Sequence, residues 1–164
     1  MRSRGSPLWL TGARPQQIFA QAHTFGDGGV PVQSVMAQIA FANGIMGHMW
    51  ISAEMPPPSL PSSEVRFQVV GAHGIIDFEN YEFLDLGTGN GWERLLTPER
   101  FDYTNDPKSP IRLVPHARVV QEFVNSILED RAPGVPGEAG RAAVAICEAC
   151  LQSARSAQAV ALGA

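Results

Sequence analysis

Three glycines alternate with other small or polar residues in the stretch YEFLDLGTGNGWERLLTP, at positions 87, 89 and 91. Glycine-rich loops can bring backbone N–H groups against the phosphates of a nucleotide, so this stretch is the first candidate for chemistry. A dinucleotide-binding fingerprint, however, has the spacing G-x-G-x-x-G and leads into a full helix. Here only WERLL precedes a Thr-Pro pair, and the Gly-Lys-Ser/Thr of a P-loop is missing. Since Asn90-Gly91 lies between two apolar runs, the stretch predicts a β-hairpin, and we expect no cofactor-binding residues in this chain.

Cys147 and Cys150 are the second candidate, because a Cys-x-x-Cys pair can bind a metal ion or take part in redox chemistry. A structural zinc site needs four ligands, and the sequence contains no second pair of cysteine or histidine at a suitable spacing. Two cysteines one helical turn apart also fit the pattern of small apolar residues on a buried helix face. We therefore predict no metal site and place both cysteines on the buried face of a helix.

Histidine and tryptophan side chains are the candidates for substrate binding. His23 precedes TFGDGG, which predicts a loop at the end of a strand. His48 and Trp50 alternate on one predicted strand, and an aromatic face beside a polar ring suits a sugar or polyol. His116 follows a proline in the expected first turn of a helix and is interpreted as a solvated residue. No Ser/His/Asp set and no carboxylate pair follows from the spacing, so the sequence predicts no catalytic residue.

The composition excludes several classes of partner. The chain has 164 residues, 45% of them hydrophobic and 17% charged, and we expect a single globular domain over residues 1–164. The net charge is -4 and no basic run is present, so nucleic acid is not expected as a partner. The apolar segment SVMAQIAFANGIMGHMWISA contains Gln38, Asn43 and His48, which disfavours a membrane span. The apolar stretch Leu8–Leu10 is too short for a signal peptide, and a cytoplasmic location is expected.

Strand-like segments occupy the first two thirds of the chain, and helical periodicity follows in the last third. The predicted strands cover residues 17–25, 32–42, 45–53, 64–70, 74–79, 81–86 and 92–96, with a short last strand at 159–162. Helices are predicted over 115–130, with Pro115 in the first turn, and over 137–158. Strands followed by helices predict an α+β fold, an open, mostly antiparallel β-sheet with two main helices packed on one face.

Alternation along three of these strands separates the predicted sheet into two faces. One set is apolar and is expected to bury against the helices: Val35, Ala37, Ile39, Phe41, Met49, Ile51, Ala53, Val65, Phe67 and Val69. The opposite set mixes apolar, aromatic, amide and basic side chains: Met36, Gln38, Met46, His48, Trp50, Arg66 and Gln68. Because this composition is typical of an interface core, we expect two copies to stack through the second face as a homo-oligomer. His48 and Trp50 also stay candidates for a sugar or polyol pocket.

Four segments follow one another in an order that has a counterpart in a known family: PLWLTGARPQQIFAQ, QIAFANGIMGHMWISA, VRFQVVGAHGIIDF and the C-terminal run from His116 to Leu162. On these segments the chain resembles the C-terminal domain of the Gfo/Idh/MocA oxidoreductases, the family of glucose–fructose oxidoreductase and inositol dehydrogenase. The resemblance implies an open antiparallel sheet that supplies part of a sugar or polyol pocket and often an oligomer interface. It also implies that NAD or NADP is bound by a preceding Rossmann domain, for which this sequence shows no motif.

Two elements of the family have no counterpart in the sequence. The Glu-Lys-Pro motif of the nucleotide domain is absent, and Arg2 and Gly5 stand where a His-x-x-Asp element often precedes Trp9 and Leu10. Arginine stays protonated and glycine has no side chain, so neither residue can act as a general base. We therefore expect the chain to begin after the catalytic apparatus and to be inactive by itself.

Two other interpretations stay open. A stand-alone α+β module could use the same face for dimerisation or for a small ligand, without catalysis. It differs from the oxidoreductase interpretation in whether the gene continues upstream into a Gly-rich βαβ segment. An unrelated curved-sheet fold, such as a nuclear transport factor 2-like cone, would need N-terminal helices, which the sequence does not predict.

Overall fold

The computed structural model describes residues 10–26, 32–56, 65–99, 105–106 and 108–163. The chain divides into two compact units, one made of Met1–Met55 and Glu122–Ala164 and the other of Pro56–Gln121. Two antiparallel sheets of four strands each and two long helices confirm the predicted α+β class. The assignment of one domain to residues 1–164 stays a prediction.

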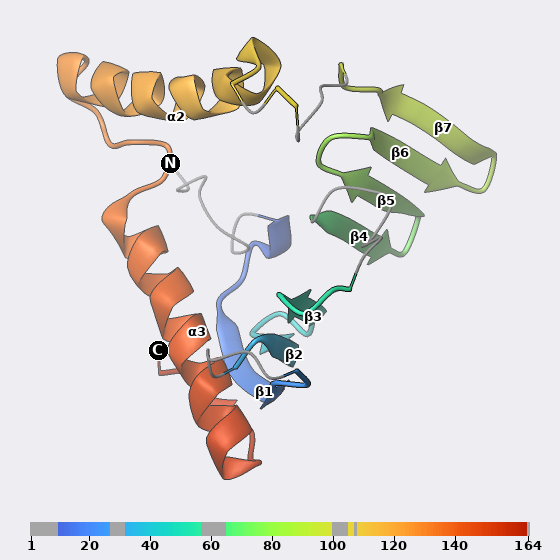
Figure 1. Ribbon diagram of the computed structural model, residues 1–164, viewed down its shortest axis with the longest axis vertical. Coiled ribbons are helices and arrows are strands. Elements are labelled where there is room, and N and C mark those ends of the chain that lie inside the picture. The colour runs from blue at the N-terminus through green and yellow to red at the C-terminus, as the bar shows by residue number, and fades with distance from the viewer. Residues whose placement is uncertain (1–9, 27–31, 57–64, 100–104, 107, 164) are drawn as a thin grey trace. The chain divides into compact units, whose positions relative to one another are not determined.

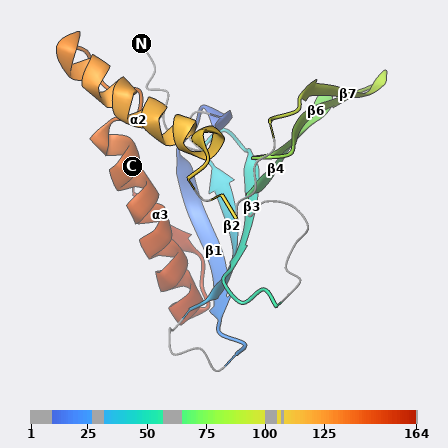
Figure 2. The ribbon, with the colours of Figure 1, turned by 45° about the horizontal axis from the view of Figure 1, so that its top comes forward.

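The first unit contains a sheet with strand order β3-β2-β1-β8. Its strands are β1 (Pro15–His23), β2 (Ser34–Phe41), β3 (Met46–Ser52) and the short β8 (Val160–Ala161). The helix α3 (Gly137–Ser156) runs along β1 on one side of this sheet (Figures 1 and 2). The predicted Asn43-Gly44 turn joins β2 to β3, and Gly44 has a φ of 83°, which glycine adopts without strain.

The core of the first unit lies between α3 and the sheet. Small and β-branched side chains fill it: Ile18, Ala20, Ala37, Ala149 and Cys150. The predicted helix-facing set is confirmed on β2, where Ala37 and Phe41 are buried. On β3 it is wrong for Ile51, which is 58% exposed, and directly after β3 it is wrong for Ala53, which is also exposed. The reason is topological, because β3 is the edge strand farthest from β1 and β8, on which α3 packs.

The buried stripe of α3 includes Cys150 but not Cys147, which is exposed. The prediction that both cysteines lie on the buried face is therefore wrong for Cys147. Three residues turn a helix by about 300°, so the earlier cysteine falls beside the stripe rather than on it. Burial raises the pKa of the Cys150 thiol, with a smaller contribution from the neighbouring Cys147.

A buried hydroxyl joins the end of α3 to the middle of β1. Strand β8 pairs with β1 only at Gln17 and Ile18. Two residues after Ile18, on the same side of β1, the backbone N–H of Ala20 donates to Ser153 Oγ over 2.8 Å. Ser153 Oγ in turn donates to the carbonyl of Gln158 over 2.6 Å, and the side chain is fully buried. This residue thus continues the hydrogen bonding of β1 where the short strand β8 ends.

The second unit contains a meander in which four consecutive strands pair in chain order. They are β4 (Arg66–Gly71), β5 (Gly74–Glu79), β6 (Phe83–Thr88) and β7 (Gly91–Leu96). The hairpin predicted from Asn90-Gly91 is confirmed, since Thr88 pairs with Gly91, whose φ is 110°.

The prediction that Val65, Phe67 and Val69 are buried is wrong, because all three are exposed. They lie on or beside β4, an edge strand of the second sheet. An edge strand has a paired neighbour on one side only, so side chains on it have fewer cross-strand contacts.

The helix α2 spans Pro110–Leu128 and starts earlier than predicted. Pro110 occupies the first turn, and Pro115, predicted there, lies inside the helix. The helix is already established before Pro115, since the N–H of Leu113 donates to the carbonyl of Ser109 over 3.1 Å. The missing N–H of an interior proline removes one helical hydrogen bond, which is why the sequence favoured a later start. No helix among the described residues is both long and apolar enough to cross a membrane.

Candidate functional site

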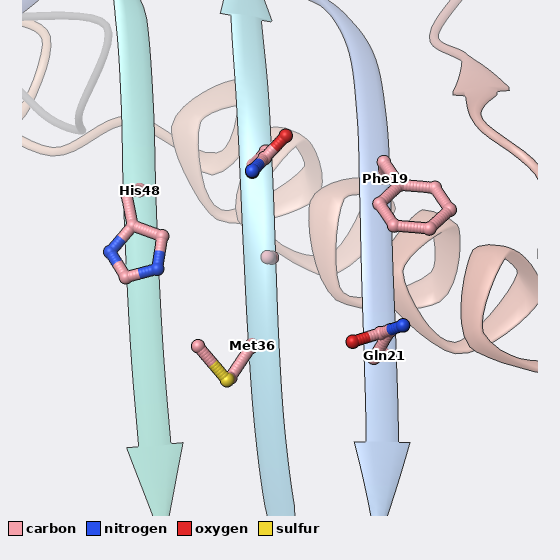
Figure 3. Close-up of a pocket in the computed structure, with 6 residues that line it drawn as sticks. Phe19, Gln21, Met36 and His48 are labelled. Atoms are coloured by element: carbon pink, nitrogen blue, oxygen red, sulfur yellow. The ribbon is translucent and has the colours of Figure 1, made fainter.

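The open face of the first sheet is the surface turned away from α3. The strand register places the residues of this side in rows across β1, β2 and β3, and the open face consists of three of them, without the row of His23, Ser34 and Ser52 at the end of the strands. The rows are Gln17, Ala40 and Met46; Phe19, Gln38 and His48; and Gln21, Met36 and Trp50. Figure 3 shows Phe19, Gln21, Met36 and His48 on one side of the three strands, with the helix behind them. The open face is therefore one continuous surface built by register alone.

All side chains of the open face are exposed, and none belongs to Asp, Glu, Lys or Arg. The large apolar ones are 37% exposed at Phe19, 50% at Met36, 86% at Met46 and 52% at Trp50. A sheet face in contact with water normally carries polar side chains. An uncharged face with four large apolar side chains is instead typical of a surface that another molecule covers.

Two shallow hollows lie in the open face around His48. The smaller, of about 90 Å³, is lined by residues that include Phe19, Met36 and His48 (Figure 3). The larger, of about 350 Å³, is lined by residues that include Gln38, Met46 and His48. Their walls combine an aromatic ring, amides and an imidazole, groups that can contact the C–H and O–H groups of a polyol. Both hollows are open to solvent, so a small ligand would be only partly enclosed by this chain.

The structure brings together most of the predicted interface residues and separates two of them. Met36, Gln38, Met46, His48 and Trp50 share the open face. Arg66 and Gln68 lie on β4, in the second sheet and the second unit. Their side chains bond to Asp77, with Arg66 Nη2 2.6 Å and Gln68 Nε2 3.3 Å from Asp77 Oδ2. The single face assumed in the sequence analysis is therefore two separate surfaces.

The surface around Arg66 is a row of charges on the second sheet. The Arg66 guanidinium holds the pKa of Asp77 below its usual range, opposed by partial burial of the carboxyl. Arg94 pairs with Asp85, and both guanidinium groups lie over the Phe83 ring, at 5.7 Å for Arg66 and 4.8 Å for Arg94. These side chains satisfy one another, which is typical of a solvated sheet face.

His23 is the last residue of β1, as predicted, and is exposed. Its ring packs edge-on against Phe25, with the ring centroids 4.7 Å apart. The turn after it is held by Glu54, whose Oε1 accepts from the N–H groups of Phe25 at 2.7 Å and Gly26 at 2.9 Å. Ser34 Oγ donates to Glu54 Oε2 over 2.7 Å, and this bond is the main reason why the pKa of Glu54 is lowered.

No local sequence pattern indicates this role for Glu54, because the two backbone N–H groups that it binds lie 28 and 29 residues earlier in the chain. Nor does the sequence alone assign Gln17, Phe19 and Gln21 to the open face. Their alternation in QQIFAQ is visible, but only the pairing of β1 with β2 shows which face they share with Met36 and Gln38.

His23 and His48 share a face but not a site. Their backbones are separated by two strand spacings, about 10 Å, and by four residues along the strand direction, about 14 Å. A small polyol cannot contact both. His48 and Trp50, by contrast, are neighbours on the same face of β3.

The glycine cluster does not fit a dinucleotide. It forms the turn between two antiparallel strands, and the Trp92 ring covers Gly87, with a Cβ at that glycine falling 3.0 Å from the ring. A pyrophosphate site needs open backbone N–H groups at the start of a helix. Among the described residues no three His, Cys, Asp or Glu side chains are grouped closely enough to hold a metal ion. Arg2, Gly5 and Trp9 lie outside the described residues.

Residues 9–162 match the Gfo/Idh/MocA family model described as "Oxidoreductase family, C-terminal alpha/beta domain". The match covers nearly the whole chain. No curated protein sequence matched it significantly.

Several solved structures share the fold. An oxidoreductase from Agrobacterium radiobacter, in complex with NAD+, L-tartaric acid and magnesium, is 16% identical with a TM-score of 0.78, over 94% of this chain and 45% of that chain. An aldose-aldose oxidoreductase from Caulobacter crescentus, complexed with glycerol, is 20% identical with a TM-score of 0.71, over 95% and 44%. A myo-inositol 2-dehydrogenase from Lactobacillus plantarum is 19% identical with a TM-score of 0.66, over 96% and 45%. The chain thus spans less than half the length of these proteins, and at such low identity the similarity establishes the fold alone.

Proposed function

Because the chain belongs to the C-terminal domain family of the Gfo/Idh/MocA oxidoreductases, we propose that it is the substrate-binding and oligomerisation domain of a sugar- or polyol-type oxidoreductase that uses NAD or NADP. The match over residues 9–162 is the observation that carries this proposal. The nucleotide would be bound elsewhere than in this chain, because the glycine hairpin does not fit a pyrophosphate. The chain by itself is then inactive.

The substrate class rests on the relatives and on the open face. Similar structures include an aldose-aldose oxidoreductase complexed with glycerol and a myo-inositol 2-dehydrogenase. Polyhydroxylated substrates are bound by aromatic faces together with a few polar groups. His48 and Trp50 supply such a pair on β3, as an alternative use of the open face to its stacking on a second copy, and His23, at the end of β1, lies too far from His48 to contact the same small substrate. None of these residues acts as a general base in this proposal, so they bind and orient a substrate.

Oligomerisation rests on the composition of the open face. Its uncharged rows can stack on the same rows of a second copy, because a two-fold axis pairs a surface with itself. Stacking removes Met36, Met46 and Trp50 from water, which is favourable by about 25 cal/mol for each Å² of apolar surface buried. Arg66 and Gln68 belong to the second sheet and are not part of the open face.

The experiment is multi-angle light scattering of the parent chain and of the variant Trp50→Glu. We expect a dimer for the parent. A carboxylate at position 50 would enter the buried contact at a cost on the order of 3 kcal/mol per copy, which for the two copies of a dimer weakens association on the order of 10,000-fold. Trp92→Glu is the matched control, because Trp92 is also exposed but lies in the second sheet. A monomeric parent at high concentration, or a Trp50→Glu variant that dimerises as the parent does, would show that the open face is not the interface.

A further inference from the structure

His48 lies in the middle row of the open face and is the only ionisable side chain among the rows defined above. We infer that the association of two copies through this face is controlled by pH, with protonation of His48 releasing the dimer. The inference rests on the proposed dimer and adds its regulation.

Every position beside His48 on the sheet carries an uncharged side chain. Gln38 is directly opposite on β2, and Met36 and Ala40 are the diagonal neighbours there. Met46 and Trp50 precede and follow His48 on the same face of β3. Phe19 continues the row on β1. The helix α3 packs on the other side of the sheet and contributes no side chain to this surface.

Among the described residues of β1, β2, β3 and their flanking turns, the charged side chains lie at the two ends of the sheet. Glu54 follows β3 and stands six residues beyond His48, about 20 Å along the strand direction. Its carboxylate is already engaged by Phe25, Gly26 and Ser34. His23 lies at that same end, and Arg14 precedes β1 at the opposite end. Arg14 and a protonated His23 are cations, so neither can compensate a charge on His48.

A second copy stacked on the open face brings the same uncharged side chains. A neutral imidazole can exchange hydrogen bonds with the amides of Gln17, Gln21 or Gln38 of that copy, because it has one donor and one acceptor. An imidazolium would be removed from water with no carboxylate opposite it, which is strongly unfavourable. The proton must therefore leave before the two faces close.

The direction of the pH dependence follows from this coupling. Histidine is the side chain that changes charge between pH 5 and 8. Association lowers its proton affinity, so the dimer forms fully at higher pH and is lost as the pH falls through the histidine range. Because the histidine of each copy must be neutral, two protons are coupled to association, and the dissociation constant rises on the order of 100-fold between pH 7.5 and pH 5.5.

The test is sedimentation equilibrium of the full 164-residue chain at pH 7.5 and 5.5, at constant ionic strength and with reductant for the free cysteines. Circular dichroism at both pH values establishes that the chain stays folded. The parent is expected to dissociate about 100-fold more readily at pH 5.5. His48→Gln should form a dimer whose dissociation constant changes less than about threefold, because glutamine is neutral throughout. His48→Lys should be monomeric even at pH 7.5.

The matched control is His23→Gln, which removes the other histidine on this side of the sheet and should keep the parent's pH dependence. A parent dimer with the same dissociation constant at both pH values would overturn the inference and leave the proposed dimer intact. So would a His48→Gln dimer that weakens at pH 5.5 as much as the parent. A parent that is monomeric at both pH values would overturn the proposed dimer and this inference together.

Discussion

At the scale of single residues, Ser153 shows how one hydroxyl can take the place of a strand. The short strand β8 leaves the Ala20 N–H without a backbone partner on that side, and Ser153 Oγ accepts from it. The same hydroxyl donates to Gln158, in the turn where Ala157 takes a φ of 53°. Serine in a helix interior usually competes with the helix for backbone hydrogen bonds. Here that tendency is used to fix the end of α3 against β1.

We predict that Ser153→Ala destabilises the first unit by about 1–3 kcal/mol, because it leaves the buried N–H of Ala20 unsatisfied. The measurement is urea unfolding followed by circular dichroism, together with hydrogen exchange of the Ala20 amide.

Ser156→Ala is the control for this change. Ser156 is exposed, and its hydroxyl makes only long contacts of 3.3 and 3.4 Å. Its loss should cost less than about 0.5 kcal/mol. Equal stability of the two variants would contradict the role assigned to Ser153.

At the scale of elements, the meander of the second unit depends on close backbone contact between β5 and β6. A Cβ added at Gly74 would lie 2.5 Å from the carbonyl oxygen of Gly87. A backbone atom cannot move aside as a flexible side chain can. A Cβ added at Gly89, in the turn between β6 and β7, would meet no atom within 4 Å.

We predict that Gly74→Ala destabilises the second sheet by about 1–3 kcal/mol, because the methyl group forces the two strands apart. The measurement is hydrogen exchange of the β5 and β6 amides, which reports on this sheet alone. Gly89→Ala should leave the exchange rates nearly unchanged. Faster exchange in both variants to the same extent would mean that the close approach at Gly74 is not the cause.

The elements themselves could be predicted well from the sequence, because their signals are local. Asn43-Gly44 and Asn90-Gly91 each mark a hairpin that the structure contains. The start of α2 also has a local signal, Ser109 before Pro110, but Pro115 obscures it, because an interior proline removes a helical hydrogen bond and suggests a later start. The assignment of β4 to a second sheet could not be predicted from the sequence. Alternation shows which side chains share one strand face, but pairing between distant strands decides which strands share a sheet.

The candidate site, like the fold, could be predicted only where a single strand determines it. The contribution of β3, with Met46, His48 and Trp50, follows from alternation within one strand. The contribution of β1 and the exclusion of Arg66 depend on strand order, which is a long-range property. Glu54 depends on hydrogen bonds to loop amides, for which no residue pattern exists in the neighbouring sequence.

At the scale of the whole molecule, the chain covers 45% of the Agrobacterium radiobacter oxidoreductase that was solved with NAD+. The cluster Gly87, Gly89 and Gly91 is a hairpin with Gly87 covered by Trp92, so it offers no helix start of the kind that binds a pyrophosphate. A domain of this family therefore contributes a surface for substrate and for assembly in the function we propose, and the cofactor belongs to another part of the enzyme.

We predict that the isolated chain does not bind NAD(H) or NADP(H), because a dinucleotide needs a row of open backbone N–H groups at a helix start to balance its phosphates. Isothermal titration calorimetry of the 164-residue chain with each of the four cofactor forms is the measurement, and no heat beyond dilution is expected at cofactor concentrations up to about 1 mM, where a Kd in the micromolar range would saturate the protein. The Agrobacterium radiobacter oxidoreductase, titrated with NAD+ under the same conditions, is the positive control. Trp92→Ala, which uncovers Gly87, should also fail to bind, since removing the ring opens the hairpin but adds no helix behind it. Micromolar binding by the parent chain would contradict the assignment of the cofactor to another part of the enzyme.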